Sequence, residues 1–524
     1  MGVNRLSGAS DSRRTTSAMA KQHWPLAVLL AGGILGAGLT GSGFPIEGAA
    51  IALMGLAPLV ILIERRLMPQ MLLGPLVFLC AHEVVHYAIG PLGQIYLVGG
   101  LRADPKGFVL AQWGTILGWL CLLAVYPAAF TAVSRRFRAR QRTYESLGQE
   151  ARWNVYAVIL TAVSIVIYAM GWAFGLSRLG GTAEEVPIDK VTSFAAFQYV
   201  PVPAVFLLAY GAYRQPRRWG LIWAAVTGAF CVMFFLDGGR GFPFWLLLLS
   251  ACGFSYAGMG KRKIVIAGII VVSAFVPLAG VVQQYRGEYD RRVDRYSDRI
   301  SGFRKSWTSF FSAQSGVGAT SQIFFERATA QNVDLVFLQT PRPMPYAGFR
   351  DCERILYTYI PLVIWPDRPA LMDGNDLAIE YGGASFGSKG SYMPATGDGY
   401  RRFGWLGILM IYGLVGACLG LLTGLTWSFR HRLEWLAMLT VLITMANGET
   451  TFATLLGTSY SVLWVFPKYL CFFWITAVGA RLFGERREVR TVRLVPKPAI
   501  GWASTFGEIP AGLSHSRPTG PRLH

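Results

Sequence analysis

Apolar runs of about 17–25 residues recur along the chain, and short polar segments separate them. A helix of that length crosses a hydrocarbon core of about 30 Å. The pattern therefore predicts an all-α fold, a polytopic membrane helical bundle of about twelve spans. Three runs are short and one is interrupted, so the predicted count is accurate to within one or two. The predicted spans cover 24–40, 48–63, 71–93, 108–134, 155–177, 192–213, 219–236, 242–258, 264–283, 404–426, 434–451 and 460–480.

Basic clusters follow every second predicted span, which predicts the orientation through the positive-inside rule. The clusters include Arg65 and Arg66, Arg135 and Arg136, Arg214 with Arg217 and Arg218, Lys261 to Lys263, Arg430 and Arg432, and Arg481. Both termini are then cytoplasmic: a basic N-terminus at 1–22 and a polar, disordered tail at 485–524. Spans one to nine fill 23–283 and spans ten to twelve fill 404–484. The segment 284–403 between them becomes a large extracytoplasmic loop.

Composition agrees with a membrane protein that has several spans. Apolar residues make up 53% of the chain and charged residues only 15%. The net charge of +20 lies in clusters between spans, which predicts contact with anionic membrane lipids and no nucleic acid. Six of the seven cysteines fall inside predicted spans and only Cys352 lies outside them, so no disulfide framework is predicted.

The segment 284–403 combines charged and aromatic side chains, which suit either salt bridges and an interfacial belt or the binding of phosphate and sugar faces. Two amphipathic helices are predicted, at 285–307 and 321–339. No histidine occurs between His86 and His431, so proton abstraction in this loop falls to a carboxylate. Aromatic residues are interleaved with the charges. The candidate side chains are Arg286, Arg327, Arg342, Arg350, Arg354, Arg368, Arg401, Arg402, Glu326, Asp367, Glu380 and Asp398.

The string His82-Glu83-Val84-Val85-His86 in the third span has a second interpretation. Two histidines four residues apart share a helix face and are able to bind zinc, with the glutamate as a general base. Together with Leu236-Asp237-Gly238 it resembles the motifs of site-2-type intramembrane zinc proteases. The Asn and Pro that usually precede that aspartate are missing here. We favour a polar patch inside the bundle, because intramembrane ionisable residues face the bundle interior.

Two strings around the loop resemble a different family. "ILYTYIPLVIWPDRP" (355–369) and "TGDGYRRFGWLG" (396–407), which leads into an apolar span, are similar to motifs of the bacterial oligosaccharide repeat-unit polymerases, the O-antigen-polymerase-like membrane glycosyltransferases. "GGRGFPFWLLLL" (238–249) is similar to the Gly-Ser-Arg-Gly turn of that family. The likeness covers roughly 230–426 with motifs.

This resemblance implies a GT-C-like enzyme that polymerises oligosaccharide repeat units carried on an undecaprenyl-type diphosphate, for an O-antigen or an exopolysaccharide. A chain-length regulator and a flippase of the same pathway are implied partners, and no cofactor or metal is required. The catalytic carboxylate would be one of Asp367, Asp398 and Glu326. The implied substrate-binding residues are Arg240, Arg327, Arg368, Arg401, Arg402, Trp365 and Tyr400.

The chain departs from the family pattern at two positions. Leu362 stands where an arginine commonly follows the proline, and Gly399 stands where an acidic residue is frequent. A polysaccharide ligase and a secondary transporter remain as alternatives to the polymerase. A ligase of the related kind would use a loop histidine that this chain lacks, and a transporter would show two repeated halves.

Overall fold

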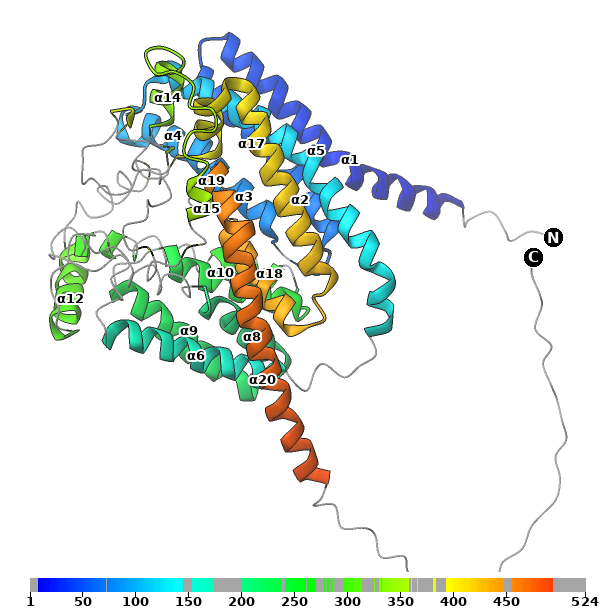
Figure 1. The fold of residues 1–524 in the computed structure, drawn as a ribbon. Helices are drawn as coiled ribbons and strands as arrows, with labels where there is room; N and C mark the ends of the chain where they lie inside the picture. Colours follow the sequence, from blue (N-terminus) through cyan, green and yellow to red (C-terminus); the bar gives the residue numbers. More distant parts are fainter. Residues whose placement is uncertain are drawn as a thin grey trace, which may run out of the picture.

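The computed structural model describes residues 8–71, 73–144, 153–173, 199–236, 241–260, 296–312, 332–357, 393–446 and 454–492, with a few short pieces between them that include 329–330 and 380–382. Within these ranges every regular element is a helix (Figure 1). The longer helices are α1 (Gly8–Gly41), α2 (Pro45–Leu67), α3 (Pro75–Val84), α5 (Pro105–Tyr144), α6 (Trp153–Ala173), α8 (Pro201–Arg214), α9 (Pro216–Leu236), α10 (Gly241–Tyr256), α12 (Tyr296–Ser312), α17 (Ala395–Ser428), α18 (Leu433–Met445) and α20 (Phe466–Val492). The short ones are η1 (Val85–Ile89), α4 (Gly90–Gly93), η2 (Gln94–Val98), α14 (Val333–Gln339), α15 (Arg354–Tyr357), α19 (Leu455–Tyr460) and η4 (Ser461–Val465).

Among the described residues, eight helical stretches are long and apolar enough to cross a membrane, which confirms the prediction of an all-helical membrane protein. Shorter apolar helices at 242–256 and 433–445 match two further predicted spans, and α8 overlaps a third. The predicted ninth span, 264–283, lies largely outside the described residues, so the total of about twelve stays a prediction. The eight are Trp24–Gly41, Pro45–Leu67, Pro75–Val98, Pro105–Phe137, Trp153–Met170, Pro216–Leu236, Ala395–Ser428 and Leu455–Leu482.

Helices α5 and α17 form the central pair, and glycines allow their backbones to approach closely. A Cβ on Gly118 would lie 2.3 Å from the Tyr412 ring, and one on Gly420 would lie 2.6 Å from the carbonyl oxygen of Tyr126. Because the paired positions rise together along both helices, α5 and α17 run parallel. Small residues at such contacts are typical of packing between membrane helices, where close van der Waals contact replaces hydrophobic exclusion.

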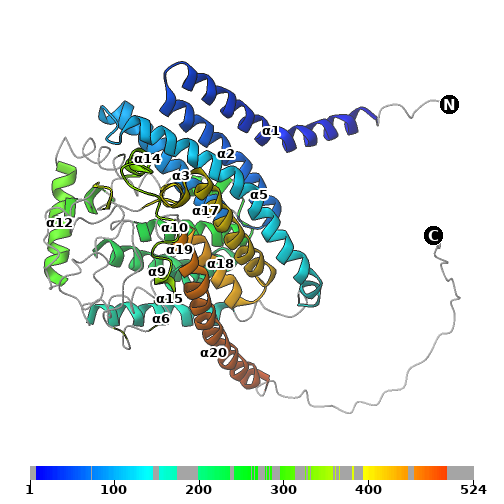
Figure 2. The ribbon, with the colours of Figure 1, turned by 45° about the horizontal axis from the view of Figure 1, so that its top comes forward.

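The remaining helices surround this pair in two groups (Figures 1 and 2). Helix α2 packs on both α1 and α5 and extends the central pair on one side. Helix α8 packs on α6, α9 and α10 and forms the second group. Helices α18 and α20 contact each other and join the groups, because α18 also contacts α17 and α8 while α20 contacts α6.

The basic ends of several helices lie together on one side of the bundle. The rings of Phe137 and Phe429 are 5.1 Å apart, which brings the ends of α5 and α17 together. Nearby, the Arg481 guanidinium of α20 donates to the buried Glu434 carboxylate at the start of α18, at 3.1 and 3.2 Å. The first residues of α17 therefore lie at the opposite end of the bundle from Phe429 and Arg481.

A buried carboxylate fixes the start of α3. Glu64, near the end of α2, is 3% exposed and accepts backbone N–H bonds from Gly74 at 3.0 Å, Leu76 at 3.0 Å and Val77 at 2.9 Å. The first N–H groups of a helix have no partner within it, and a negative charge there is favoured by the helix dipole. Glu64 thus satisfies three such groups inside the bundle.

A π-helical turn continues α3 and changes where its carbonyl groups point. In η1 the usual i to i−4 bonds are replaced, which frees carbonyls for other donors. Ala330 N–H donates to the carbonyl of His86 at 3.0 Å, and the Gln112 side chain donates to that of Tyr87 at 2.7 Å. The loop around Ala330 is thereby fixed against the membrane helices.

The described helices add detail to three predicted boundaries near the large loop and the tail. Helix α17 begins at Ala395, but non-helical backbone at Phe403 and Gly404 separates its first part, 395–402, from the rest, so the predicted start of the tenth span at 404 coincides with this break. In the described part of the second amphipathic prediction, 321–339, Phe325 and α14 are helical, and Asn332 before α14 adopts a left-handed conformation with φ 61°. Helix α20 reaches Val492, beyond the predicted start of the tail at 485.

Candidate functional site

The first two turns of α17 form a separate short helix, Ala395–Arg402, that folds back on the longer part. Phe403 and Gly404 interrupt the helix, with Gly404 at φ +63° and ψ −143°. A residue with a side chain rarely adopts that conformation, so glycine is required here. The fold-back brings Gly399 against the next turn, where an added Cβ would lie 2.7 Å from the Cα of Ile408. Gly399, the departure from the family pattern, is therefore needed for packing.

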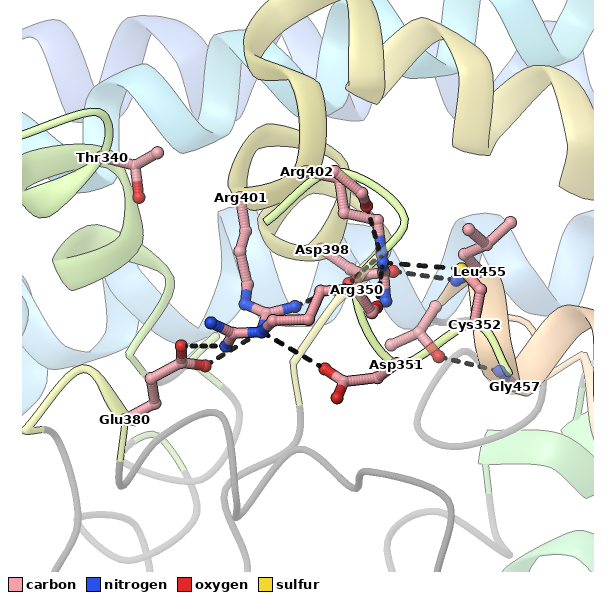
Figure 3. A network of polar contacts seen from close by, with 12 residues as sticks. Thr340, Arg350, Asp351, Cys352, Glu380, Asp398, Arg401, Arg402, Leu455 and Gly457 are labelled. Carbon is pink, nitrogen blue, oxygen red and sulfur yellow. Dashed lines mark hydrogen bonds and ion pairs between the residues drawn. The ribbon is translucent and has the colours of Figure 1, made fainter. Parts of the chain in front are cut away.

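Arg402 and Asp398 form a buried ion pair that joins three segments. Both side chains are 1% exposed, and the Arg402 Nε donates to the Asp398 carboxylate at 2.9 Å. The same guanidinium donates to the carbonyl oxygens of Gly348 at 2.9 Å and Arg350 at 3.1 Å. The second carboxylate oxygen of Asp398 accepts from the backbone N–H of Leu455 at 2.9 Å. This pair ties the start of α17 to the 348–350 turn and to α19 (Figure 3).

A second ion-pair group lies beside the first and reaches the surface. The buried Arg401 guanidinium donates to Glu380 at 2.9 Å, and Arg350 donates to the other oxygen of the same carboxylate. The Arg350 side chain is 53% exposed and that of Glu380 is 25% exposed, so Glu380 bridges a buried arginine and an exposed one. The hydrogen bond that Arg350 donates to Glu380 raises the pKa of Arg350, which therefore stays charged. Figure 3 shows both arginines directed at the Glu380 carboxylate.

Asp351 adds a second carboxylate to this group. Its oxygens lie 3.6 Å from Arg350 Nε, 4.0 Å from Arg401 and 3.5 Å from Arg354. Three arginines thus surround two carboxylates, Asp351 and Glu380. We call these five residues, Arg350, Asp351, Arg354, Glu380 and Arg401, the arginine–carboxylate cluster. Two of its arginines, Arg350 and Arg354, are partly exposed. Guanidinium groups suit phosphate, because one guanidinium is able to donate to two oxygens at once.

Aromatic rings surround Tyr400 on the same short helix. Tyr400 stacks on Phe337 with ring centroids 4.0 Å apart, and Tyr346 and Trp405 meet it edge to face at 6.5 and 5.7 Å. Tyr346 is 48% exposed and Trp405 is 41% exposed, so this aromatic group is partly open. Exposed ring faces of this kind suit a sugar or the membrane interface.

The structure brings together four of the sequence-predicted site residues. Asp398, Tyr400, Arg401 and Arg402 lie on one short helix, but Asp398 and Arg402 are saturated by each other and by backbone groups. Trp365 contacts Tyr357 with ring centroids 5.3 Å apart. The other five predicted site residues lie outside the described residues, and they are Glu326, Arg327, Arg240, Asp367 and Arg368.

Sequence reasoning missed the role of Asp351 and the pairing of Arg350 with Glu380. Asp351 belongs to no motif, and Arg350 and Glu380 are thirty positions apart, so no spacing rule connects them. The one available signal was the number of arginines and carboxylates within a single loop.

The histidines of the HEVVH string lie in a polar patch inside the bundle. The rings of His82 and His86 are stacked with centroids 4.1 Å apart, and His86 Nδ1 lies 3.2 Å from the carbonyl oxygen of His82. Among the described residues, no group of three His, Cys, Asp or Glu side chains is placed to hold a metal ion. Asp237, the third ligand of the zinc hypothesis, lies outside the described residues.

Comparisons with protein-family models, with curated proteins and with solved structures found no match to this chain. The functional argument therefore depends on the arginine–carboxylate cluster, the membrane fold and the motifs around them.

Proposed function

We propose that this protein polymerises lipid-diphosphate-linked oligosaccharide repeat units into a surface polysaccharide, at the outer leaflet of the bacterial cytoplasmic membrane. The observation that carries the proposal is the chain Arg401–Glu380–Arg350, which runs from the buried start of α17 to an exposed guanidinium. It lies within the segment whose motifs resemble the polymerase family. A cationic site beside membrane spans suits a substrate with an anionic diphosphate and a lipid tail.

Topology supports an outer location for the cluster. The basic ends of α5, α17 and α20 share one side of the bundle, and basic loops are retained in the cytoplasm. The cluster is at the opposite end of α17, which the same rule places outside. The sugar part of a lipid-linked repeat unit is polymerised on that side in the family that the motifs resemble.

Arg350 is the described side chain best placed to bind the donor diphosphate. Its guanidinium is the exposed member of the cluster, and a phosphate oxygen would replace the Glu380 carboxylate as its partner. Arg354, 27% exposed, would add a second cation. Together they would stabilise the negative charge that develops as the bond from the sugar to the diphosphate breaks. Arg240, Arg327 and Arg368 remain expected members of the same site.

If a phosphate displaces Glu380 from Arg350, the Glu380 carboxylate would become available as the general base. The acceptor sugar hydroxyl forms the new glycosidic bond, and its proton passes to a carboxylate within hydrogen-bonding reach. Glu380 is the partly exposed carboxylate of the cluster, whereas Asp398 is held by Arg402 and Leu455. We assign Asp398 and Arg402 to holding the segments in place, with Asp367 and Glu326 as further candidate bases.

Replacing Arg350 tests this proposal. The test uses a strain that depends on this protein for long glycan chains. At equal protein level, Arg350→Ala is expected to lower the amount of long-chain glycan at least tenfold. Arg350→Lys would restore it only in part, because an ammonium lacks the planar fork. Arg342→Ala is the matched control, since Arg342 is exposed on the same segment and lies outside the cluster. A normal ladder with Arg350→Ala would refute the diphosphate role of Arg350.

A further inference from the structure

A second group of arginines lies at the other end of α17, around one buried carboxylate. Glu434, at the start of α18, accepts two hydrogen bonds from Arg481 of α20, at 3.1 and 3.2 Å. The Nε of Arg432 lies 3.8 Å from the same carboxylate. The Glu434 side chain is 1% exposed, whereas those of Arg432 and Arg481 are 41% and 39% exposed. Two partly open guanidiniums therefore meet at a single buried anion.

Aromatic rings fix the turn between α17 and α18 and add a third cation to it. The ring of Phe429 packs on Phe137 of α5 with centroids 5.1 Å apart. The Arg430 guanidinium lies 4.3 Å from the centre of the Trp427 ring and donates to the Trp427 carbonyl oxygen at 3.0 Å. A guanidinium over an aromatic face is attracted by the ring and held in one orientation. Arg430 thus has a defined position two residues before Arg432.

The charges in this group do not balance. Arg430, Arg432 and Arg481 supply three positive charges and Glu434 supplies one negative charge, so three minus one leaves a net charge of +2. Among the described residues, Glu434 is the only carboxylate within 4.0 Å of Arg432 or Arg481. A partly buried cation loses some of its hydration, and an anion compensates that loss. The excess positive charge therefore favours a bound anion.

The position of the group along the spans indicates which anion it meets. The candidate span in α17 ends at Ser428, and the last candidate span ends at Leu482, one residue after Arg481. Arginines at the ends of spans reach the level of the lipid headgroups, where phosphate is the abundant anion. Arg481 bonds Glu434 through Nη2 alone. A guanidinium has five N–H donors, so donors remain for a second acceptor.

We propose that Arg432 and Arg481 bind the headgroup phosphate of one anionic phospholipid, which joins the turn before α18 to α20. Both guanidiniums lie within 4.0 Å of the same carboxylate, so one phosphate is able to reach both. Arg430 adds to the positive potential of the site. A zwitterionic headgroup binds less well there, because the excess positive charge repels its ammonium group. The site is a specific one for a single lipid, and it does not depend on glycan polymerisation.

A titration with a short-chain lipid tests the site. Native mass spectrometry of the full-length protein in neutral detergent follows the binding of dioctanoyl phosphatidylglycerol. Arg432→Gln should bind this lipid about tenfold more weakly than the wild type, because it loses a charge-assisted hydrogen bond to phosphate. Arg66→Gln is the matched control, since Arg66 is an exposed arginine at the basic end of α2 and its loss removes the same charge. An equal loss of affinity in both variants would show general electrostatic attraction and overturn the site.

Two further titrations of the wild type identify the ligand. Dioctanoyl phosphatidylcholine has the same tails and a phosphate but no net charge, and it should bind more weakly than phosphatidylglycerol. Equal affinity for the two lipids would contradict an anionic lipid as the ligand. Inorganic phosphate in excess should leave the bound phosphatidylglycerol in place. Its displacement by inorganic phosphate would show that the site takes a soluble anion and would overturn the assignment to a lipid.

A second variant covers the case in which Arg432→Gln does not fold. Arg432→Lys keeps the positive charge but loses the planar fork that reaches two oxygens at once. Its affinity for phosphatidylglycerol should lie below that of the wild type, with an unchanged melting temperature in neutral detergent. Wild-type affinity in Arg432→Lys would show that a point charge is sufficient and would refute the guanidinium contact with phosphate.

Discussion

Replacement of Asp398 distinguishes a residue that holds the fold from a catalytic base. In Asp398→Ala, the Arg402 guanidinium keeps its charge and its 1% exposure but loses its carboxylate partner. Removal of one member of a buried ion pair costs about 3–5 kcal/mol, because the remaining charge is desolvated and unpaired. The backbone N–H of Leu455 also loses its acceptor, which adds about 1–3 kcal/mol. We therefore expect a free energy of unfolding lower by at least about 3 kcal/mol.

Two further variants separate the contributions. Asp398→Asn keeps an oxygen for Leu455, so it should cost less than the alanine variant. The double variant Asp398→Leu with Arg402→Met removes both charges and should cost less than the sum of the two single changes, since neither leaves an unpaired ion. Unfolding in mixed micelles by increasing denaturant measures the stability of the wild type, of each single variant and of the double variant. Equal stability of Asp398→Asn and the wild type, with glycan synthesis lost, would refute this reasoning and restore Asp398 as a base.

Three other predictions follow from individual contacts. Gly399→Ala should cost about 1–3 kcal/mol of stability, because an added Cβ would meet the backbone at Ile408. Gly413→Ala should be tolerated, because an added Cβ there would lie 3.5 Å from its nearest neighbour. Equal thermal stability of the two variants would contradict the fold-back. Glu64→Ala should lower the melting temperature in detergent, because three buried N–H groups at the start of α3 lose their acceptor; an unchanged melting temperature would show that they find other partners. An impermeant maleimide added to intact cells should label Cys352 and not a cysteine placed at Arg430, and the reverse result would invert the topology. Burial raises the pKa of the Cys352 thiol, so its labelling should quicken as the pH rises and the thiolate forms.

The hydrophobic pattern predicted the membrane helices well. A bilayer requires an apolar run of sufficient length, and such a run is visible within one continuous stretch of sequence. The eight long helices coincide with predicted spans, and glycine spacing explains how the central pair packs. The hydropathy pattern did not reveal the short helix at 395–402, because it contains Asp398, Arg401 and Arg402, three charges that such a pattern assigns to a loop. Those charges are buried only because they pair with one another and with distant segments.

The site was harder to predict for the same reason. Asp398 and Arg402 looked like reactive groups in sequence, and the structure shows them bound to each other and to backbone atoms. Arg350 and Glu380 are thirty positions apart in sequence, and only the fold brings their side chains into contact. Glu83 belonged to a string that suggested zinc, yet no group of three His, Cys, Asp or Glu side chains among the described residues is placed to hold a metal ion. Local motifs identified the right segments, but the roles within them depend on contacts between segments.

Deletion of the gene in a strain whose surface polysaccharide depends on it is the most direct test of the proposed polymerase. The account predicts that the glycan ladder collapses to a single repeat unit on its acceptor, and that a plasmid copy of the wild-type chain restores the long forms. Loss of all glycan would indicate a ligase or a transporter of the repeat unit, and an intact ladder would contradict the proposed function outright.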